Sequence, residues 1–507
     1  MKLTTDALDE TARRFSEKTA LIDQEGTTTF AEFRRQARAI ATALARRNIF
    51  HAPVVVFLGQ TRAAVISFLG VAYAGAFYTV LDAKMPKVRQ AKILETLSPA
   101  AIITDQAHRG RLMDPGEIPV LFYEDLLRQE IEETLLASVR EKVSEQDILY
   151  VLFTSGSTGT PKGVTIRQRS VMDYTEWVRE TFAVTEKDII GNQAPFFFDN
   201  SVLDIYQTVR NGATLCIIPR KAFIFPIRLL EYVRDHHISL VFWVPSVLCS
   251  VANFGILNDC DISCLKKVLF AGEVMPNKQL NIWRKRLPKA VFANLYGPTE
   301  VTVDCTYYIV NRPFRDDEPL PIGRECRPET VFVLDEEDRR IMQPEFKGEL
   351  CVRGASLALG YYKNPEKTKA VFVQNPLRKE REIIYRTGDI VHYNMHGELM
   401  YDGRKDFQIK YMGHRIELGE IETAAAALPD IHQAVCLYDA EASEIVLCYA
   451  GAAEPAAVYR ALRDLLPDYM LPKITRQLDR LPLTANGKFD RKELMRSYAQ
   501  DKRQKNQ

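Results

Sequence analysis

Short runs of β-branched and aromatic residues alternate with amphipathic segments between residues 54 and 297, and this rhythm constrains the fold more than any other feature. Amphipathic patterns such as "RSVMDYTEWVRETF" (169–182) separate several of the runs. The runs are "VVVFLG" (54–59), "AAIITD" (100–105), "ILYVLF" (148–153), "ATLCIIP" (213–219), "SLVFWVP" (239–245), "KVLFAGE" (267–273) and "VFANLYG" (291–297). Strands that alternate with helices form βαβ units, so we predict an α/β fold with largely parallel sheets. Ligands then bind at the carboxyl ends of the strands.

One segment is apolar enough to raise the question of a membrane span. Residues 63–81, "AAVISFLGVAYAGAFYTVL", carry no charge and are formally long enough to cross a bilayer. Gly75 falls where a helix would end, the β-favouring "FYTVL" follows, and Asp82 closes the segment. A buried helix that leads into a buried strand fits this order better, so we predict no integral membrane segment.

The pattern of the chain changes after about residue 400. A length of 507 residues exceeds a single core and suggests two to four folding units. Hairpin-like strands run into one helix in "ELMYDGRKDFQIKYMGHRIELGEIETAAAAL", and further strand and helix pairs follow. We predict a large N-terminal domain, residues 1–403, of βαβ-type sheets with flanking helices. A small, mobile α+β domain, residues 404–507, follows a boundary between Gly403 and Asp406.

Composition excludes several classes of function. Sixty-seven basic residues nearly balance 66 acidic ones, so nothing favours nucleic acid or an anionic membrane as a partner. The nine cysteines are scattered without a C-x-x-C pair, which is typical of a reducing, cytoplasmic compartment. Cys260 and Cys264 lie close together but lack a second ligand pair, so we expect structural cysteines. The acidic residues near the N-terminus argue against a signal peptide.

The loop "TSGSTGTPKG" at residues 154–163 follows one of the predicted strands. Glycines let backbone N–H groups converge, hydroxyls add donors and Lys162 adds a positive charge, so this composition suits phosphate oxygens. The loop differs from a Walker motif, because Pro161 precedes the lysine and Gly163 follows it. By itself it fits a phosphate site and a flexible turn equally well.

Six further segments decide between these two interpretations. In order along the chain they are "FDNSVLDIY" (198–206), "YGPTE" (296–300), "GELCVRGASLALGYYKNPEKT" (348–368), "YRTGD" (385–389), "GRKDFQIKYMGHRIELGEIE" (403–422) and "NGKFDRKEL" (486–494). With the loop, this order resembles the adenylate-forming superfamily over nearly the whole chain. The chain is most similar to its amino-acid-activating branch, which comprises nonribosomal peptide synthetase adenylation domains and D-alanine:D-alanyl carrier protein ligases.

The resemblance implies ATP as a substrate and Mg²⁺ as its companion ion. In this family a carboxylate attacks the α-phosphorus of ATP, which gives an acyl-adenylate and pyrophosphate, and a thiol then takes the acyl group. Glu300 matches the residue that binds Mg²⁺, a hard cation shared with phosphates. The other residues implied at the nucleotide are Thr154, Ser155, Gly156, Ser157, Thr158, Gly159, Lys162, Asn294, Tyr296, Gly297, Thr299, Asp389 and Arg404.

The same resemblance implies the catalytic residue and the hinge. Lys488 matches the lysine that bridges the substrate carboxylate and the α-phosphate, where it offsets the charge of two approaching anions. From its surroundings alone, it would be an exposed turn lysine. Asp406 matches the hinge about which the small domain rotates between the two half-reactions, and Gly413 lies in the loop that meets the pantetheine arm.

The substrate is implied to be an amino acid. Asp199 matches the acid that pairs with the α-ammonium group, a partner that fatty and aryl acids lack. Ala271 stands where D-alanine ligases tend to carry cysteine, and Asp304 would not be satisfied by a methyl side chain. Either Asp304 pairs with another residue or the substrate bears a donor. The residues implied around the side chain are Asn200, Leu203, Phe242, Leu269, Ala271, Leu295, Val303 and Asp304.

The expected function is therefore adenylation of D-alanine, with a small polar amino acid such as serine next. Because no carrier domain follows Leu494, we expect transfer to the phosphopantetheine thiol of a small carrier protein in trans. Two alternatives remain open at this point. One is an acyl-CoA synthetase that acts on another carboxylic acid, and the other is a nucleotide-binding protein without catalysis.

Overall fold

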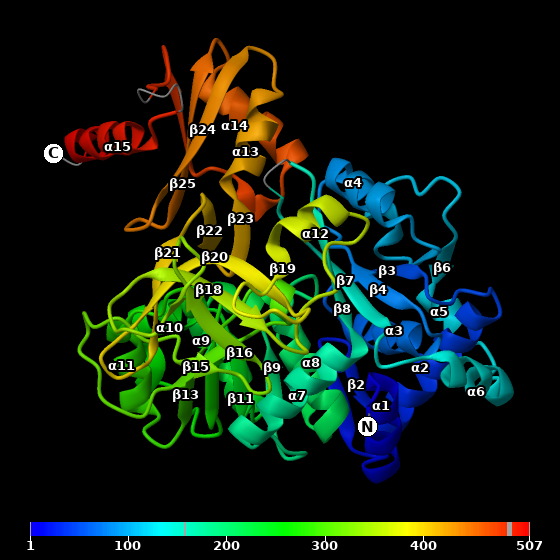
Figure 1. Ribbon diagram of the computed structural model, residues 1–507. Coiled ribbons are helices and arrows are strands. Elements are labelled where there is room, and N and C mark those ends of the chain that lie inside the picture. The colour runs from blue at the N-terminus through cyan, green and yellow to red at the C-terminus, as the bar shows by residue number, and fades with distance from the viewer. Residues whose placement is uncertain (1, 157–158, 484–488, 506–507) are drawn as a thin grey trace. The chain divides into compact units, whose positions relative to one another are not determined.

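The structure is a computed structural model that describes residues 2–156, 159–483 and 489–505. The chain divides into two compact units (Figure 1). The first unit comprises Met1–Ala83, Leu97–Leu152 and Gly163–Lys405. The second comprises Asp406–Gln507 together with two earlier segments, Lys84–Thr96 and Phe153–Lys162. The glycine-rich loop at residues 154–163 therefore belongs to the second unit, except for Gly163, which belongs to the first.

The largest sheet of the first unit has nine strands, and its central strands are parallel. Antiparallel pairs close it at both ends. The strand order confirms the predicted βαβ arrangement for the middle of the chain. In spatial order the strands are β15 (Arg324–Glu325), β14 (Thr306–Ile309), β13 (Val291–Tyr296), β12 (Lys267–Phe270), β11 (Leu240–Trp243), β9 (Ile189–Asn192), β10 (Thr214–Ile217), β1 (Thr19–Asp23) and β2 (Gly26–Thr29).

A second sheet has six strands and contains the other predicted β-branched runs. Its central strands are again parallel. The strand β7 ends at Thr154, the first residue of the glycine-rich loop, as expected for a ligand loop at a carboxyl edge. In spatial order the strands are β6 (Val120–Phe122), β5 (Ala101–Thr104), β3 (Pro53–Phe57), β4 (Phe77–Val80), β7 (Ile148–Thr154) and β8 (Lys162–Arg167).

A third sheet, between residues 330 and 404, is antiparallel, which the prediction of largely parallel sheets did not foresee. Its longest strand alternates buried and half-buried residues, the pattern of a sheet with one covered face. The change of pattern therefore begins well before residue 400. The strands are β17 (Arg340–Ile341), β16 (Thr330–Leu334), β18 (Gly348–Arg353), β20 (Ile383–Tyr393), β19 (Phe372–Gln374) and β21 (Leu399–Arg404).

One buried cluster joins the two larger sheets through helices that lie between them (Figure 1). Its side chains include Phe68, Val178 and Leu203 from three of these helices and Tyr150 from β7. The helices that contribute most of its residues are α1 (Thr4–Arg14), α2 (Phe30–Ala45), α3 (Arg62–Tyr73), α7 (Gln168–Phe182) and α8 (Asn200–Asn211). The remaining helices of eight or more residues in the first unit are α6 (Glu133–Lys142), α9 (Pro226–Asp235), α10 (Pro245–Asn253) and α11 (Asn277–Arg286).

In the second unit, a three-stranded sheet is covered by helices on both faces. Alternate residues of its strands pack against α13 and α14 on one face, for example Cys436 and Leu447, and against α15 on the other, for example Leu437 and Val446. A separate hairpin precedes it. The elements are α4 (Lys87–Leu97), the hairpin β22 (Gln408–Tyr411) and β23 (His414–Glu417), α13 (Leu418–Ala426), β24 (Ile431–Asp439), β25 (Glu444–Gly451), α14 (Pro455–Leu465), β26 (Ile474–Leu478) and α15 (Arg491–Lys505).

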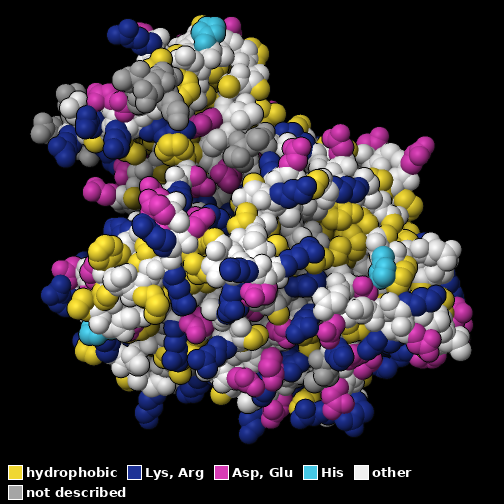
Figure 2. All heavy atoms as spheres, viewed as in Figure 1, with side chains coloured by type: hydrophobic (Ala, Val, Ile, Leu, Met, Phe, Trp, Pro, Cys, Tyr) yellow, Lys and Arg dark blue, Asp and Glu magenta, His cyan; other side chains and the backbone are white. Residues whose placement is uncertain are grey.

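The surface shows no concentration of one charge on the face in view. Figure 2 shows basic and acidic side chains interspersed over it, in agreement with the net charge of +1. In the part of the chain that the structure describes, no helix has the length and apolar character needed to cross a bilayer.

The charge-free segment at 63–81 forms a buried helix and strand, as predicted. Helix α3 begins after Thr61, whose side chain accepts from the backbone N–H of Ala64, and β4 follows from Phe77 to Val80. Gly70 lies where α3 meets α2. A Cβ at this position would lie 2.7–2.8 Å from the side chain of Ile40, so the close approach of the two helices depends on glycine.

We expect Gly70→Ala to destabilise the first unit. Alanine has the better helix propensity by about 1 kcal/mol. The methyl group, however, would press on the buried Cβ of Ile40 and on a backbone carbonyl, and overpacking of this kind costs about 1–3 kcal/mol. Chemical denaturation measures the change in unfolding free energy. Gly110→Ala is the control, because nothing lies within 4 Å of its added Cβ, and equal stability of both variants would contradict the packing argument.

Candidate active site

Three of the residues implied at the nucleotide come together, because Tyr296 and Arg404 converge on the carboxylate of Asp389. This side chain is 2% exposed. Its Oδ1 accepts from Nη1 of Arg404 at 3.0 Å, and its Oδ2 accepts from the hydroxyl of Tyr296. Burial, and then the charge of Asp389, raises the pKa of Tyr296 well above its usual value. The pair Asp389 and Arg404 is set by the β20–β21 register, in which the two residues lie opposite each other.

The turn after β13 carries the other residues of "YGPTE". A Cβ on Gly297 would lie 2.3 Å from the carbonyl oxygen of Val303, so only glycine fits this turn. Glu300 is fully buried, and its Oε1 accepts from the hydroxyl of Tyr361 at 2.7 Å. Thr299 is buried beside it. Asn294, near the end of β13, donates from its amide to the carbonyl oxygen of Pro321 at 2.8 Å.

Asp199 stands immediately before α8. Its side chain makes no capping hydrogen bond to that helix, although an aspartate in this position often caps. Burial raises the pKa values of Tyr150 and Tyr174 well above the usual range, and the charge of Asp199 is a lesser cause in both cases. The hydroxyl of Tyr150 is fully buried and has no hydrogen-bond partner among the described atoms. Asn200, the first residue of α8, is half-buried.

The apolar residues implied around the substrate side chain come together in the structure. All six lie in the cluster between the two larger sheets, and Phe242 pairs with Leu269 across β11 and β12. Asp304 is 1% exposed, and its Oδ2 accepts from the hydroxyl of Tyr174 at 2.7 Å. The six residues are Leu203, Phe242, Leu269, Ala271, Leu295 and Val303.

A strained turn positions Asp304. Thr302 and Val303 have φ values of 58° and 71°, in the left-handed region that β-branched residues avoid. Surrounding hydrogen bonds hold this turn: the hydroxyl of Thr302 donates to the carbonyl oxygen of Ser356 at 2.6 Å, and the backbone N–H of Ser356 donates to Glu329 at 3.0 Å. Strain of this kind persists where the surroundings hold it and is common at functional sites.

The glycine-rich loop is closely wound and contacts residues 415–420 of its own unit. Gly156 has the carbonyl oxygen of Thr160 only 2.1 Å from where its Cβ would lie, and Gly159 adopts a φ of 75°. The hydroxyl of Ser155 donates to the carbonyl oxygen of Arg415 at 2.7 Å. Lys162 lies 3.5 Å from Glu417. Thr154 has its hydroxyl buried without a partner among the described atoms. Two implied loop residues, Ser157 and Thr158, lie outside the described residues, as does Lys488.

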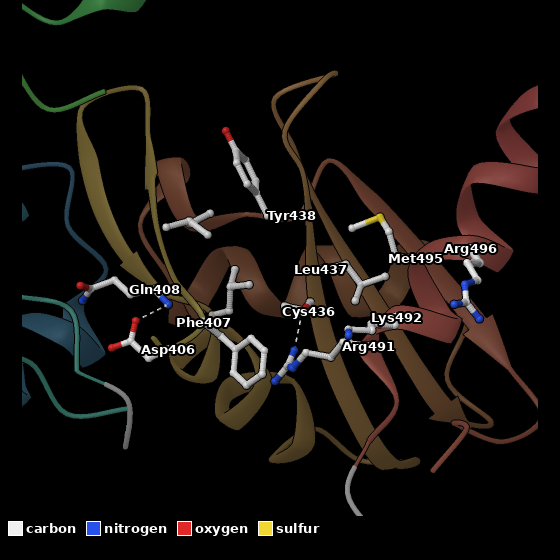
Figure 3. A pocket seen from close by; sticks show the side chains of 12 residues that line it. Asp406, Phe407, Gln408, Cys436, Leu437, Tyr438, Arg491, Lys492, Met495 and Arg496 are labelled. Atoms are coloured by element: carbon white, nitrogen blue, oxygen red, sulfur yellow. Dashed lines mark hydrogen bonds between the residues drawn. The ribbon is translucent and has the colours of Figure 1, made fainter. Parts of the chain in front are cut away.

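The implied hinge residue Asp406 begins the second unit's main segment and lines a cavity of about 470 Å³ (Figure 3). Its Oδ1 accepts from the backbone N–H of Gln408 at 3.2 Å. Phe407 and Arg491 stack on the wall of the cavity, with the guanidinium 4.1 Å from the ring centre. Gly413, with a φ of 78°, follows Met412 at 50° in a two-residue hairpin turn between Tyr411 and His414.

A family model described as "AMP-binding enzyme" matches residues 8–362. The chain belongs to the AMP-binding enzyme family. Membership makes it an adenylate-forming ligase, and the expected superfamily is confirmed.

Curated relatives of this AMP-binding enzyme include synthases named for zwittermicin A, tyrocidine and bacitracin. Zwittermicin A synthase ZmaJ of Bacillus cereus is 30% identical over 96% of this chain and 93% of that protein. Tyrocidine synthase 1 of Brevibacillus parabrevis is 30% identical over 96% of this chain, and this chain spans 44% of it. Bacitracin synthase 1 of Bacillus licheniformis is also 30% identical over 96% of this chain, yet this chain spans only 9% of it. The chain thus corresponds to one segment of the longer relatives.

Solved structures share the fold. The Vibrio cholerae adenylation domain AlmE, solved with glycyl-adenosine-5′-phosphate, has a TM-score of 0.86 at 23% identity, covering 98% of both chains. The four-domain nonribosomal peptide synthetase AB3403, bound to AMP and glycine, has a TM-score of 0.69 at 29% identity, over 96% of this chain and 36% of that one.

The nine cysteines of the AMP-binding enzyme are free thiols, as expected from their spacing. Among the described residues, no group of three or more His, Cys, Asp or Glu side chains could hold a metal ion without other ligands. Glu300 is the single carboxylate that the resemblance implies for Mg²⁺, an ion usually held by one or two carboxylates together with phosphates and water.

Several residues near the site were not singled out from the sequence, although Tyr361 and Asp204 stand within quoted motifs. Tyr174 lies on the buried face of an amphipathic helix, and a tyrosine in such a place usually needs a partner for its hydroxyl. Tyr361, in a loop, and Tyr150, on β7, are buried tyrosines as well. Asp204 is fully buried on α8, and burial raises its pKa well above the usual value, while Asn192 donates to it at 2.8 Å. Glu329 lies 25 residues beyond Asp304 and supports the strained turn.

We expect Glu329→Gln to flatten the dependence of stability on pH. Burial raises the pKa of Glu329 from 4.5 to about 7, so the folded state binds its proton more tightly than the unfolded state. The stabilisation is complete below pH 4.5 and is lost as the pH rises to about 7, by up to about 3 kcal/mol. Denaturant unfolding at pH 5 and pH 8 measures this loss, and the glutamine variant should lack it.

The exposed acid Glu336 supplies the control for this experiment. Glu336→Gln should keep the wild-type difference between pH 5 and pH 8. A wild-type difference that survives in Glu329→Gln would assign the pH dependence to another group.

Proposed function

We propose that this enzyme adenylates an amino acid. The carboxylate of the amino acid attacks the α-phosphorus of ATP, the aminoacyl-adenylate forms, and pyrophosphate leaves. In a second step the aminoacyl group passes to the phosphopantetheine thiol of a carrier protein that acts in trans, and AMP leaves. D-Alanine is the first candidate substrate, and a small polar amino acid such as serine is the second.

The position of Asp199 is the observation that carries this proposal. Its carboxylate is half-buried at the start of α8, does not cap that helix, and adds to the raised pKa values of Tyr150 and Tyr174. A substrate α-ammonium group would neutralise the carboxylate and form charge-assisted hydrogen bonds with it. The hydroxyl of Tyr150, buried without a hydrogen-bond partner among the described atoms, is a second polar group whose pKa the charge of Asp199 helps to raise, after burial. A fatty or aryl acid would bring no positive charge to Asp199, which disfavours an acyl-CoA synthetase.

The nucleotide would bind to the residues around Asp389. This carboxylate would accept the ribose hydroxyls in place of the hydroxyl of Tyr296, while the hydrogen bond from Arg404 holds its orientation. The ring of Tyr296 would stack on the adenine, and Asn294 would pair with its amino group. Glu300 would hold Mg²⁺, which supplies charge neutralisation at the phosphates when bound. Lys488, outside the described residues, remains the proposed catalytic lysine, and Asp406 the proposed hinge.

The pair Tyr174 and Asp304 bears on the substrate's side chain. Because the hydroxyl of Tyr174 donates to Asp304, a substrate need not bring a donor of its own. This supports a small side chain such as the methyl group of alanine. Several of the apolar residues implied around it, such as Phe242 and Leu269, are bulky and buried, which also favours a small side chain. The solved relative AB3403 was bound to glycine, which is also a small amino acid.

Amino-acid-dependent exchange of pyrophosphate into ATP, over a panel of D- and L-amino acids, tests this function. We expect D-alanine, or else a small polar amino acid, to give the highest rate. Asp199→Asn should raise the KM for the amino acid by about ten- to a hundredfold, since a hydrogen bond to a charged group contributes about 1.5–3 kcal/mol. The acid Asp173 on α7 serves as control, and Asp173→Asn should leave the KM unchanged.

No exchange with any amino acid would favour a nucleotide-binding protein without catalysis. Loss of free coenzyme A thiol in the presence of a fatty acid would favour an acyl-CoA synthetase.

We expect Tyr174→Phe to change the substrate preference. The variant removes the hydroxyl that donates to Asp304 and leaves the ring in place. Asp304 would then favour a substrate that brings a donor, so the ratio of kcat/KM for serine over alanine should rise by about tenfold. Phe182→Tyr, a change on the same helix away from Asp304, is the control. An unchanged ratio in Tyr174→Phe would remove this pair from the substrate site.

A further inference from the structure

Two carboxylates of the second unit interact with donor groups of the glycine-rich loop, one through a hydrogen bond and one through an ion pair. The backbone N–H of Gly156 donates to Oε2 of Glu420 at 3.2 Å, and the ammonium group of Lys162 lies 3.5 Å from Oε1 of Glu417. The other oxygen of Glu420 accepts from Nη1 of Arg89, a residue of α4. Arg89 and Glu420 are 4% and 3% exposed, so this contact is buried.

This set of donors has the chemistry of a phosphate site. A glycine N–H, an ammonium group and a guanidinium group bind phosphate oxygens, and arginine does so with a planar fork that matches two oxygens. Carboxylate oxygens accept from the same donors. Arg89 also has a donor to spare, because its Nε is buried without a partner among the described atoms. A buried guanidinium with an unused N–H is costly in a merely structural ion pair.

We propose that Arg89 is a ligand for the terminal phosphates of ATP and for pyrophosphate, and that Glu417 and Glu420 take the place of those phosphates when they are absent. The proposal rests on the adenylation proposed above, which supplies the phosphates. It assigns Arg89 to the binding of the leaving group and the two glutamates to its release.

The glutamates and pyrophosphate cannot occupy the loop at the same time, because all of them are negatively charged. The carboxylates and a pyrophosphate ion are both anions, and they compete for the same N–H groups. If both lay at the loop together, Arg89 and Lys162 would face more negative charge than they can neutralise in a buried site. Arrival of pyrophosphate must therefore displace Glu420 from Gly156 and Arg89. Departure of pyrophosphate lets Glu420 return to the N–H of Gly156 and to Arg89.

Calorimetric titration of the full chain with inorganic pyrophosphate and Mg²⁺ tests the proposal without any amino acid. Glu420→Gln keeps the shape of the side chain and removes its charge, so pyrophosphate should bind about tenfold more tightly. Arg89→Met should bind it about tenfold more weakly, and Arg89→Lys should fall between Arg89→Met and the wild type. The double variant Glu420→Gln with Arg89→Met lacks an unpaired buried charge, and it should bind more weakly than Glu420→Gln alone.

Glu422 provides a matched control on the same helix. It forms an ion pair with Arg491 at 2.7 Å, away from the loop, so Glu422→Gln should leave the affinity for pyrophosphate unchanged. Thermal unfolding of each variant shows that the fold is intact. If the affinity falls equally in Glu420→Gln and Arg89→Met, or changes in neither, the pair is a structural ion pair and the proposal is overturned. Equal tightening in Glu422→Gln would assign the effect to net charge.

Failure of this proposal and failure of the proposed function give different results. Amino-acid-dependent exchange with normal pyrophosphate affinity in all variants would overturn the role of Arg89 alone. The expected shifts in affinity, without exchange for any amino acid, would support the phosphate site and overturn the adenylation.

Discussion

The buried carboxylate of Asp389 links the antiparallel sheet of the first unit to its nine-stranded sheet. Asp389 lies on β20 and Arg404 on β21, while Tyr296 ends β13 of the other sheet. A buried charge of this kind is tolerated only with good partners, and removal of one partner leaves a penalty of several kcal/mol. The apolar cluster between the same two sheets includes Tyr296 and fixes their separation. The site for the nucleotide therefore depends on the packing of two sheets, not on a single loop.

The same region shows how a specificity residue can be positioned by the backbone. Gly297 lets the carbonyl oxygen of Val303 approach to within 2.3 Å of the place that a Cβ would occupy, and the strained Thr302 and Val303 turn the chain back toward β14. Asp304 follows this turn and reaches the hydroxyl of Tyr174, 130 residues earlier in the chain. Its position is thus set by glycine and strain on one side and by a buried phenol on the other.

The parallel sheets and the family could be predicted from the sequence, whereas the antiparallel sheet and pairs of distant side chains could not. The strand and helix rhythm predicted the parallel sheets because periodicity is local, and seven motifs in order predicted the family. The antiparallel sheet of residues 330–404 was missed, although β20 alternates buried and half-buried residues, because β17 and β19 are very short and a helix, Pro365–Val371, interrupts the strands. Pairs such as Tyr174 with Asp304 have no local signature. They arise only when α7 packs against the turn after β13, which no pattern within either segment reports.

The role proposed for Arg89 could not be predicted from the sequence either. On α4 its neighbours in sequence are ordinary, and the segment has the composition of one of several basic helices. The role proposed for Arg89 depends on Glu420, 331 residues later, whose carboxylate also accepts from the N–H of Gly156. The loop's composition suits any anion, because glycine N–H groups and an ammonium group do not distinguish a carboxylate from a phosphate. A loop that must release its ligand in every cycle gains from an internal carboxylate of this kind, since the N–H of Gly156 then keeps an acceptor after the phosphates leave.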